Sequence, residues 1–106
     1  MGVLKGVLKE EAGRLQQTAK SYQLQIAKLP KGSVQAKKLK GIYYYYLAYR
    51  KGGKVIYRYL GRSAGKSLQA LKQKIQDRRR YEVELRKTLV NLNRLRKIIY
   101  GKRNAI

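Results

Sequence analysis

Apolar residues recur along the first third of the chain in alternating steps of four and three. The repeat runs through Leu8, Ala12, Leu15, Ala19, Tyr22, Ile26 and Leu29. Because such steps are typical of a heptad seam, the pattern predicts a helix over residues 2–29 with a narrow apolar stripe. Pro30 ends this helix, since the residue before a proline is pushed out of the α region.

The period changes to about two over residues 33–61, where apolar and polar side chains alternate. The alternation predicts three strands, Ser33–Leu39, Ile42–Arg50 and Lys54–Leu60, joined by two-residue turns at Lys40-Gly41 and Gly52-Gly53. Turns of this length fix the register. The expected facing pairs include Lys37 with Tyr44, Ala36 with Tyr45, Tyr46 with Tyr59, Leu47 with Arg58, and Tyr45 with Leu60.

The predicted sheet has two unlike faces. The apolar face, expected to lie against the helices, carries Val34, Ala36, Tyr43, Tyr45, Leu47, Tyr49, Ile56 and Leu60. The tyrosine face, expected to meet solvent, carries Gln35, Lys37, Tyr44, Tyr46, Arg50, Tyr57 and Tyr59, with Ile42 and Val55 near the turns. Tyrosine favours strands and aromatic pairs stabilise sheets, so a structural role alone is one interpretation. The other is a nucleic-acid surface, where rings pack on bases or sugars and cations bind phosphate.

A second helical pattern begins at Ser67, an expected N-cap, and extends over residues 67–100. The segment "QDRRR" interrupts its apolar stripe, so the pattern suits one long helix or two helices joined near Arg78. Gly101 is expected just past the helix end, at the start of a basic tail over residues 101–106. The heptads suit an intramolecular antiparallel coiled coil and also a homodimer, and the sequence leaves both open.

These elements together predict one α+β domain. A long N-terminal helix and a C-terminal helix or helix pair pack as an antiparallel coiled coil, with a three-stranded antiparallel sheet between them in the chain. No apolar run is long enough for a secretory signal or a membrane span, so we expect a cytoplasmic protein without a membrane partner.

Charge is the strongest compositional signal. The chain has 27 Lys and Arg against five Asp and Glu, a formal net charge of +22. A domain so basic repels itself unless a polyanion offsets the charge, and nucleic acid is the commonest such partner. Cysteine and histidine are absent, which removes thiolate metal sites and the usual general base. We therefore expect no enzyme activity, no cofactor, no metal and no small-molecule substrate.

The segment "GRSAGKS", residues 61–67, is similar to a P-loop but has three residues instead of four between its first Gly and Gly-Lys-Ser. We expect Gly61 and Gly65 to reverse the chain and begin a helix. Arg62 and Lys66 beside that helix N-terminus would contact a phosphate of a nucleic acid.

The predicted function is non-enzymatic nucleic-acid binding, with duplex DNA favoured over RNA. The alternatives are association with RNA or the ribosome, and a phage or mobile-element protein that inhibits a host nucleic-acid enzyme. Arg78, Arg79 and Arg80 cover three-quarters of a helix turn, and guanidinium groups suit bidentate phosphate contacts. The predicted binding residues are Lys37, Lys40, Tyr44, Tyr46, Arg50, Lys51, Lys54, Tyr57, Tyr59, Arg62, Lys66, Arg78, Arg79 and Arg80.

Residues 32–62, "GSVQAKKLKGIYYYYLAYRKGGKVIYRYLGR", resemble a shared element of an uncharacterised family of small basic prokaryotic and viral proteins. That resemblance implies the strand arrangement rather than an activity. The tyrosine strand, the Gly-Gly-Lys turn and the final Leu-Gly are also similar to the arm-binding domain of tyrosine recombinases. The second resemblance, at the level of the fold, implies a three-stranded sheet that enters the DNA major groove.

Overall fold

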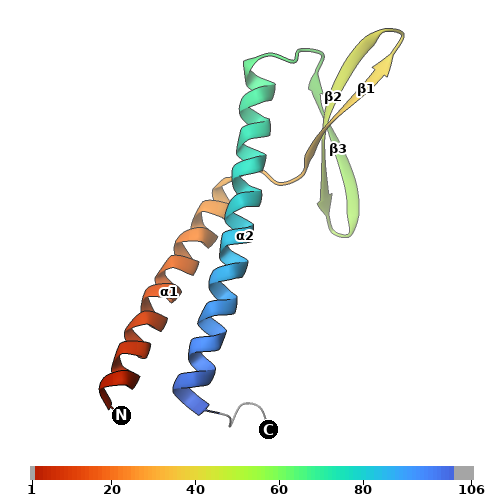
Figure 1. Ribbon diagram of the computed structural model, residues 1–106. Coiled ribbons are helices and arrows are strands. Elements are labelled where there is room, and N and C mark those ends of the chain that lie inside the picture. Colours follow the sequence, from red (N-terminus) through yellow and green to blue (C-terminus); the bar gives the residue numbers. More distant parts are fainter. Residues whose placement is uncertain (1, 102–106) are drawn as a thin grey trace. The chain divides into compact units, whose positions relative to one another are not determined.

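The computed structural model describes residues 2–101, which form two helices and a three-stranded antiparallel sheet (Figure 1). The elements in chain order are α1 (Gly2–Lys28), β1 (Ser33–Leu39), β2 (Ile42–Lys51), β3 (Lys54–Gly61) and α2 (Lys66–Tyr100). The predicted α+β class is confirmed, and the element boundaries agree with prediction to within one residue. Beyond Gly101, the predicted basic tail lies outside the described residues.

The chain divides into two compact units. The helix unit comprises residues 1–27 and 80–106, and the sheet unit comprises residues 28–79. The long helix α2 contributes its first part to the sheet unit and its second part to the helix unit.

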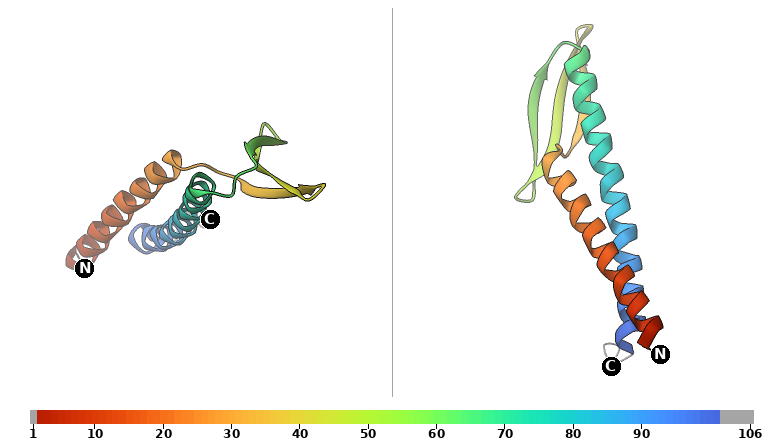
Figure 2. Two further views of the ribbon diagram at one scale, coloured as in Figure 1. Left: turned by 90° about the horizontal axis from the view of Figure 1, so that it is seen from above. Right: turned by 90° about the vertical axis from the view of Figure 1, so that its left-hand side faces the viewer.

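The helix unit is an antiparallel pair made by α1 and the second part of α2 (Figures 1 and 2). Ala19 of α1, which belongs to the predicted apolar stripe, is buried, as are Leu92 and Ile99 of α2. The rings of Tyr22 and Tyr81 contact each other across the pair, with centroids 5.9 Å apart. The predicted antiparallel packing of the N- and C-terminal helices is therefore confirmed.

The sheet has the strand order β1-β2-β3, with both pairings antiparallel. The structure confirms the predicted register with one exception. Tyr45 lies opposite Gly61 instead of Leu60, because an irregularity between Tyr45 and Tyr46 leaves one extra residue in β3. Both turns have positive φ at their two central residues, 53° and 81° at Lys40-Gly41 and 58° and 78° at Gly52-Gly53. This is the conformation of a type I′ hairpin turn, whose twist matches that of the flanking strands.

The first part of α2 lies on the apolar face of the sheet, within the sheet unit. Leu68 and Ile75 of α2 and Leu47 of β2 are all at most 5% exposed. Val34 of β1 lines a depression together with Ile75, so the two elements are in contact there. The expectation that a helix covers this face is confirmed over its central part only, since Tyr43 at the β1–β2 end is 48% exposed.

Helix α2 runs without a break through "QDRRR", so the alternative of two joined helices is wrong. Its apolar stripe is interrupted there because residues before position 80 pack on the sheet and residues after it pack on α1. The expected N-cap at Ser67 is also wrong: the helix begins at Lys66, and Gln69 donates its backbone N–H to the carbonyl of Gly65 at 3.1 Å. Gly101 follows the helix with φ of 72°, which confirms its predicted role.

Neither of the helices described for residues 2–101 combines the length and the apolar character that crossing a bilayer demands.

Candidate nucleic-acid interface

The tyrosine face of the sheet is open to solvent. Tyr57 and Tyr59 are each 53% exposed, and Tyr44 and Tyr46 are half-buried. Strand alternation points these side chains away from Leu47 and from the part of α2 that covers it. The expectation that these rings meet solvent is therefore confirmed within the sheet unit.

The rings on the tyrosine face are held by one another. The Tyr59 ring contacts the ring of Tyr46 at 5.4 Å between centroids and the ring of Tyr44 at 6.4 Å. The ammonium nitrogen of Lys37 lies 5.5 Å from the centroid of Tyr46 and 5.4 Å from that of Tyr57. Such cation–π contacts hold the charge of Lys37 over the rings. The result is a pre-arranged surface that offers aromatic area and positive charge together.

The two hairpin turns place further cations at the ends of this surface. Lys51 and Lys54 face each other directly across the β2–β3 hairpin, and both are exposed, as is Arg50. Lys40 is exposed in the β1–β2 turn. Like charges that face each other across strands destabilise a sheet, so the Lys51–Lys54 pair does not stabilise the hairpin. An anion bound between the two ammonium groups would offset their repulsion.

Positive charge is concentrated in the sheet unit. Residues 28–79 contain fifteen lysines and arginines and one acid, a net charge of +14. The helix unit contains twelve basic residues and four acids, a net charge of +8. The two values sum to the +22 of the whole chain.

Acids of the helix unit pair with their own neighbours. Glu11 accepts hydrogen bonds from the guanidinium of Arg14, one of them 2.9 Å from Nε to Oε2, and Glu84 lies 3.5 Å from the ammonium of Lys87. The hydrogen bond from Arg14 holds the pKa of Glu11 below its ordinary value, and the same bond raises the pKa of Arg14. In the sheet unit Asp77 accepts a hydrogen bond of 3.0 Å from Gln73. One acid cannot neutralise the fifteen cations of that unit.

Two of the three consecutive arginines have a structural role that the sequence did not indicate. Arg78 donates from Nη1 to the carbonyl of Leu29 at 2.7 Å, and Arg79 donates from Nη2 to the carbonyl of Gly32 at 3.0 Å. Both acceptors lie in the segment that joins α1 to β1. The third, Arg80, is exposed and belongs to the helix unit. Arg78 and Arg79 therefore each bind a backbone carbonyl within the sheet unit, and the phosphate contacts of all three arginines stay predictions.

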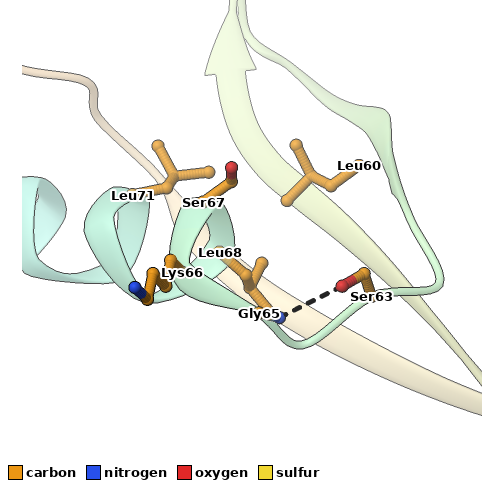
Figure 3. A pocket seen from close by; sticks show the side chains of 7 residues that line it. All are labelled: Leu60, Ser63, Gly65, Lys66, Ser67, Leu68 and Leu71. Atoms are coloured by element: carbon orange, nitrogen blue, oxygen red, sulfur yellow. Dashed lines mark hydrogen bonds between the residues drawn. The ribbon is translucent and has the colours of Figure 1, made fainter.

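The segment 61–67 connects β3 to α2 beside a pocket lined by three leucines (Figure 3). Leu60 of β3 and Leu68 and Leu71 of α2 form its apolar part (Figure 3). The hydroxyl of Ser63 accepts a hydrogen bond of 3.2 Å from the backbone N–H of Gly65. This N–H group therefore has its acceptor within the same loop. This arrangement agrees with the expected role of Gly61 and Gly65 in reversing the chain. Arg62 and Lys66 are both exposed there.

Two cations that were not among the predicted binding residues also project from the sheet. Lys38 places its ammonium 5.6 Å from the ring centroid of Tyr43 on the apolar face. Arg58 faces Leu47 in the register and is exposed. Both residues could have been identified from the sequence, because the predicted register places these two charged residues on the apolar face.

Across residues 2–101, no three acidic side chains gather where a metal ion would be held. Comparisons of the chain with protein-family models, with curated proteins and with solved structures found no match. The two resemblances stated for residues 32–62 therefore stay predictions.

Proposed function

We propose that this chain is a non-enzymatic nucleic-acid-binding protein that binds duplex DNA on the tyrosine face of its sheet. The observation that carries the proposal is the charge of the sheet unit, fifteen cations against one acid, around a face on which Tyr57 and Tyr59 are exposed. Lysines and arginines would bind phosphates and supply most of the affinity. The tyrosines would contact sugars and base edges within a groove.

The dimensions of the sheet suit the major groove. Neighbouring strands lie about 4.8 Å apart, so three strands span about 10 Å between backbone centres, and the major groove of B-form DNA is about 12 Å wide. At both ends only two strands are paired, because β3 pairs with Tyr45–Lys51 of β2 and β1 pairs with Ile42–Ala48. Each end is therefore narrower than the middle of the sheet.

The ring contacts favour a duplex over single strands. Single-strand binding depends on aromatic platforms on which separate bases stack. Here Tyr59 is flanked by Tyr44 and Tyr46, so the three rings form one surface. Duplex RNA is less suitable, because its major groove is deep and too narrow for side chains to enter.

The test is the salt dependence of binding to a duplex DNA, its single strand and an RNA hairpin of equal length. With six to ten phosphate contacts, duplex affinity is expected to fall by roughly 10³–10⁵-fold between about 50 and 200 mM salt. Duplex DNA is expected to bind most tightly of the three at each salt concentration. Tighter binding of the RNA hairpin would overturn the choice of DNA, and a salt slope near zero would overturn nucleic-acid binding altogether.

A further inference from the structure

The distal part of the β1–β2 hairpin projects beyond the rest of the sheet. Strand β3 pairs with β2 only as far as Tyr45, whereas β1 continues to pair up to the Leu39–Ile42 pair beside the turn. Residues 37–44 are therefore a two-stranded ribbon, and Figure 1 shows the two hairpins extending in opposite directions from the shared strand β2. The Lys40-Gly41 turn closes the ribbon with two residues, so its tip is narrow.

This tip carries two exposed aliphatic side chains. Leu39 is 62% exposed and Ile42 is 40% exposed, and they face each other directly across the ribbon. By strand alternation they project on the same side as Lys37 and Tyr44, which belong to the tyrosine face. Lys38 and Lys40 are exposed beside them.

The opposite tip shows that a hairpin of this sheet does not require apolar residues at its end. There the pair next to the turn is Lys51 with Lys54, and the next pair is Arg50 with Val55. One tip is therefore charged and the other has an apolar pair surrounded by lysines. An exposed aliphatic pair beside lysines matches a ligand that is anionic outside and apolar inside.

We propose that Leu39 and Ile42 form a wedge that enters between two stacked base pairs of duplex DNA and kinks it. The inference rests on the proposed function and deepens it. Minor-groove proteins that insert leucine or isoleucine at a base step partly unstack it and bend the duplex by about 20–90°, and the wedge proposed here would open a step in the same way from the major-groove side. Lys37, Lys38 and Lys40 would bind the phosphates on either side of the opened step.

The tip fits a base step better than it fits a lipid surface. Membrane-surface anchors bury a continuous apolar face, often with aromatic side chains at the headgroup level. Here the apolar part consists of two side chains, and the ring of Tyr43, on the other face of the ribbon, lies 5.6 Å from the ammonium of Lys38. A wedge also predicts a preference for flexible pyrimidine–purine steps, which unstack most easily.

The test compares the full chain with a variant that carries Leu39→Thr and Ile42→Thr. Threonine is β-branched and therefore favours strands, and both positions are exposed, so the variant is expected to fold. Each protein is mixed with a duplex of about 30 base pairs that has one central TA step. Energy transfer between dyes at the two ends measures bending, and 2-aminopurine at the TA step measures unstacking. Val90→Thr, at a position of the helix unit that is 46% exposed, is the matched control.

The wild type and Val90→Thr are expected to bend the duplex and to raise 2-aminopurine fluorescence. The double variant is expected to bind within about threefold of wild-type affinity, with the same salt slope, because it loses no cation. It should leave the duplex straight and the 2-aminopurine stacked. Circular dichroism of the double variant confirms that it is folded.

Two results would overturn the wedge while leaving DNA binding intact. One is a wild-type complex that is straight and stacked, and the other is a double variant that bends DNA as the wild type does. Absence of duplex binding at low salt would instead remove the proposed function and the wedge with it. Vesicles that contain phosphatidylserine form a separate arm. If the double variant loses binding to these vesicles and still bends DNA, the tip is a membrane contact and the wedge is wrong.

Discussion

Arg78 donates a hydrogen bond from Nη1 to the backbone carbonyl of Leu29, 2.7 Å away and forty-nine positions earlier in the chain. Arg79 does the same for Gly32 at 3.0 Å. The two guanidinium groups thereby fasten the segment between α1 and β1 to α2 within the sheet unit. A basic cluster that resembles a phosphate site in the sequence thus contributes to the fold.

The bond from Arg78 is expected to contribute measurably to stability. Arg78→Ala removes a charged donor from a half-buried carbonyl, so the free energy of unfolding should fall by about 1.5–3 kcal/mol. Urea unfolding followed by circular dichroism measures the change. Lys74→Ala, at an exposed position of the same helix, is the control and should change stability by less than about 0.5 kcal/mol. Equal stability of the two variants would contradict the structural role of Arg78.

Glycine is required at position 32 for two separate reasons. Its φ is 119°, and a Cβ added there would lie 2.3 Å from the carbonyl oxygen of Ala48. The backbone conformation alone should make Gly32→Ala destabilising by about 1–3 kcal/mol, and the contact with Ala48 adds to that. Gly13→Ala offers a control of opposite sign: the position is helical with open space around it, so the change should stabilise by about 0.5–1 kcal/mol. Thermal unfolding of both variants would show the opposite shifts.

Periodicity and turn chemistry predicted most of the fold. Alternation and two type I′ turns fix which residues face each other, and this is why the pairing of Tyr46 with Tyr59 was predicted. The extra residue at Leu60 was not, because a bulge depends on how β3 leaves the sheet toward α2 and has no signature in the strand pattern. Exposure of Tyr57 and Tyr59 followed from the same alternation.

The roles of individual charges were harder to predict than the strands. Whether an arginine binds a phosphate or a carbonyl depends on which loop lies beside it. Arg78 and Arg79 meet a segment nearly fifty residues away, and no local pattern indicates that approach. The sequence shows that residues 28–79 carry many cations and one acid. Only the structure shows that these residues form one compact unit, so that the charges lie on the same part of the molecule.

The pairing of Glu11 with Arg14 gives α1 a dependence on pH. The hydrogen bond from Arg14 lowers the pKa of Glu11 in the folded state, so the pair contributes stability above the ordinary glutamate pKa of about 4.3. That contribution is lost as the pH falls through the lowered pKa. Glu11→Gln should therefore be less stable than the wild type at neutral pH, and the difference should disappear in acid. Urea unfolding at several pH values measures it, with Glu10→Gln, a neighbouring exposed carboxylate, as the control. A difference that persists in acid would contradict this explanation.

The facing lysines of the β2–β3 hairpin should oppose stability and support binding. Replacing Lys51 and Lys54 with glutamine removes a like-charge pair, so stability should rise by a few tenths to about 1 kcal/mol. The same variant should bind duplex DNA more weakly, with the salt slope reduced by about one for each phosphate that the hairpin no longer binds. Lys5→Gln with Lys9→Gln removes equal charge from the helix unit and should leave the slope unchanged. An equal reduction of the slope in the two variants would mean that net charge, and not the hairpin, binds the DNA.

Substitutions of Tyr57 and Tyr43 compare the contributions of the two faces of the sheet to binding. Tyr57 is 53% exposed on the tyrosine face and Tyr43 is 48% exposed on the apolar face, and each ring has a lysine ammonium over it. Tyr57→Ala should weaken duplex binding by about 1 kcal/mol, because it removes a ring of the binding face and the cation–π contact that holds the ammonium of Lys37 over that face. Tyr43→Ala should weaken binding less, because it removes no ring of the tyrosine face and leaves Lys38 itself in place. The two side chains are similarly exposed, so the two changes should alter stability alike. Fluorescence titration of a labelled duplex compares them at one salt concentration. Should the Tyr43 variant lose as much affinity as the Tyr57 variant, the tyrosine face would not be the binding surface.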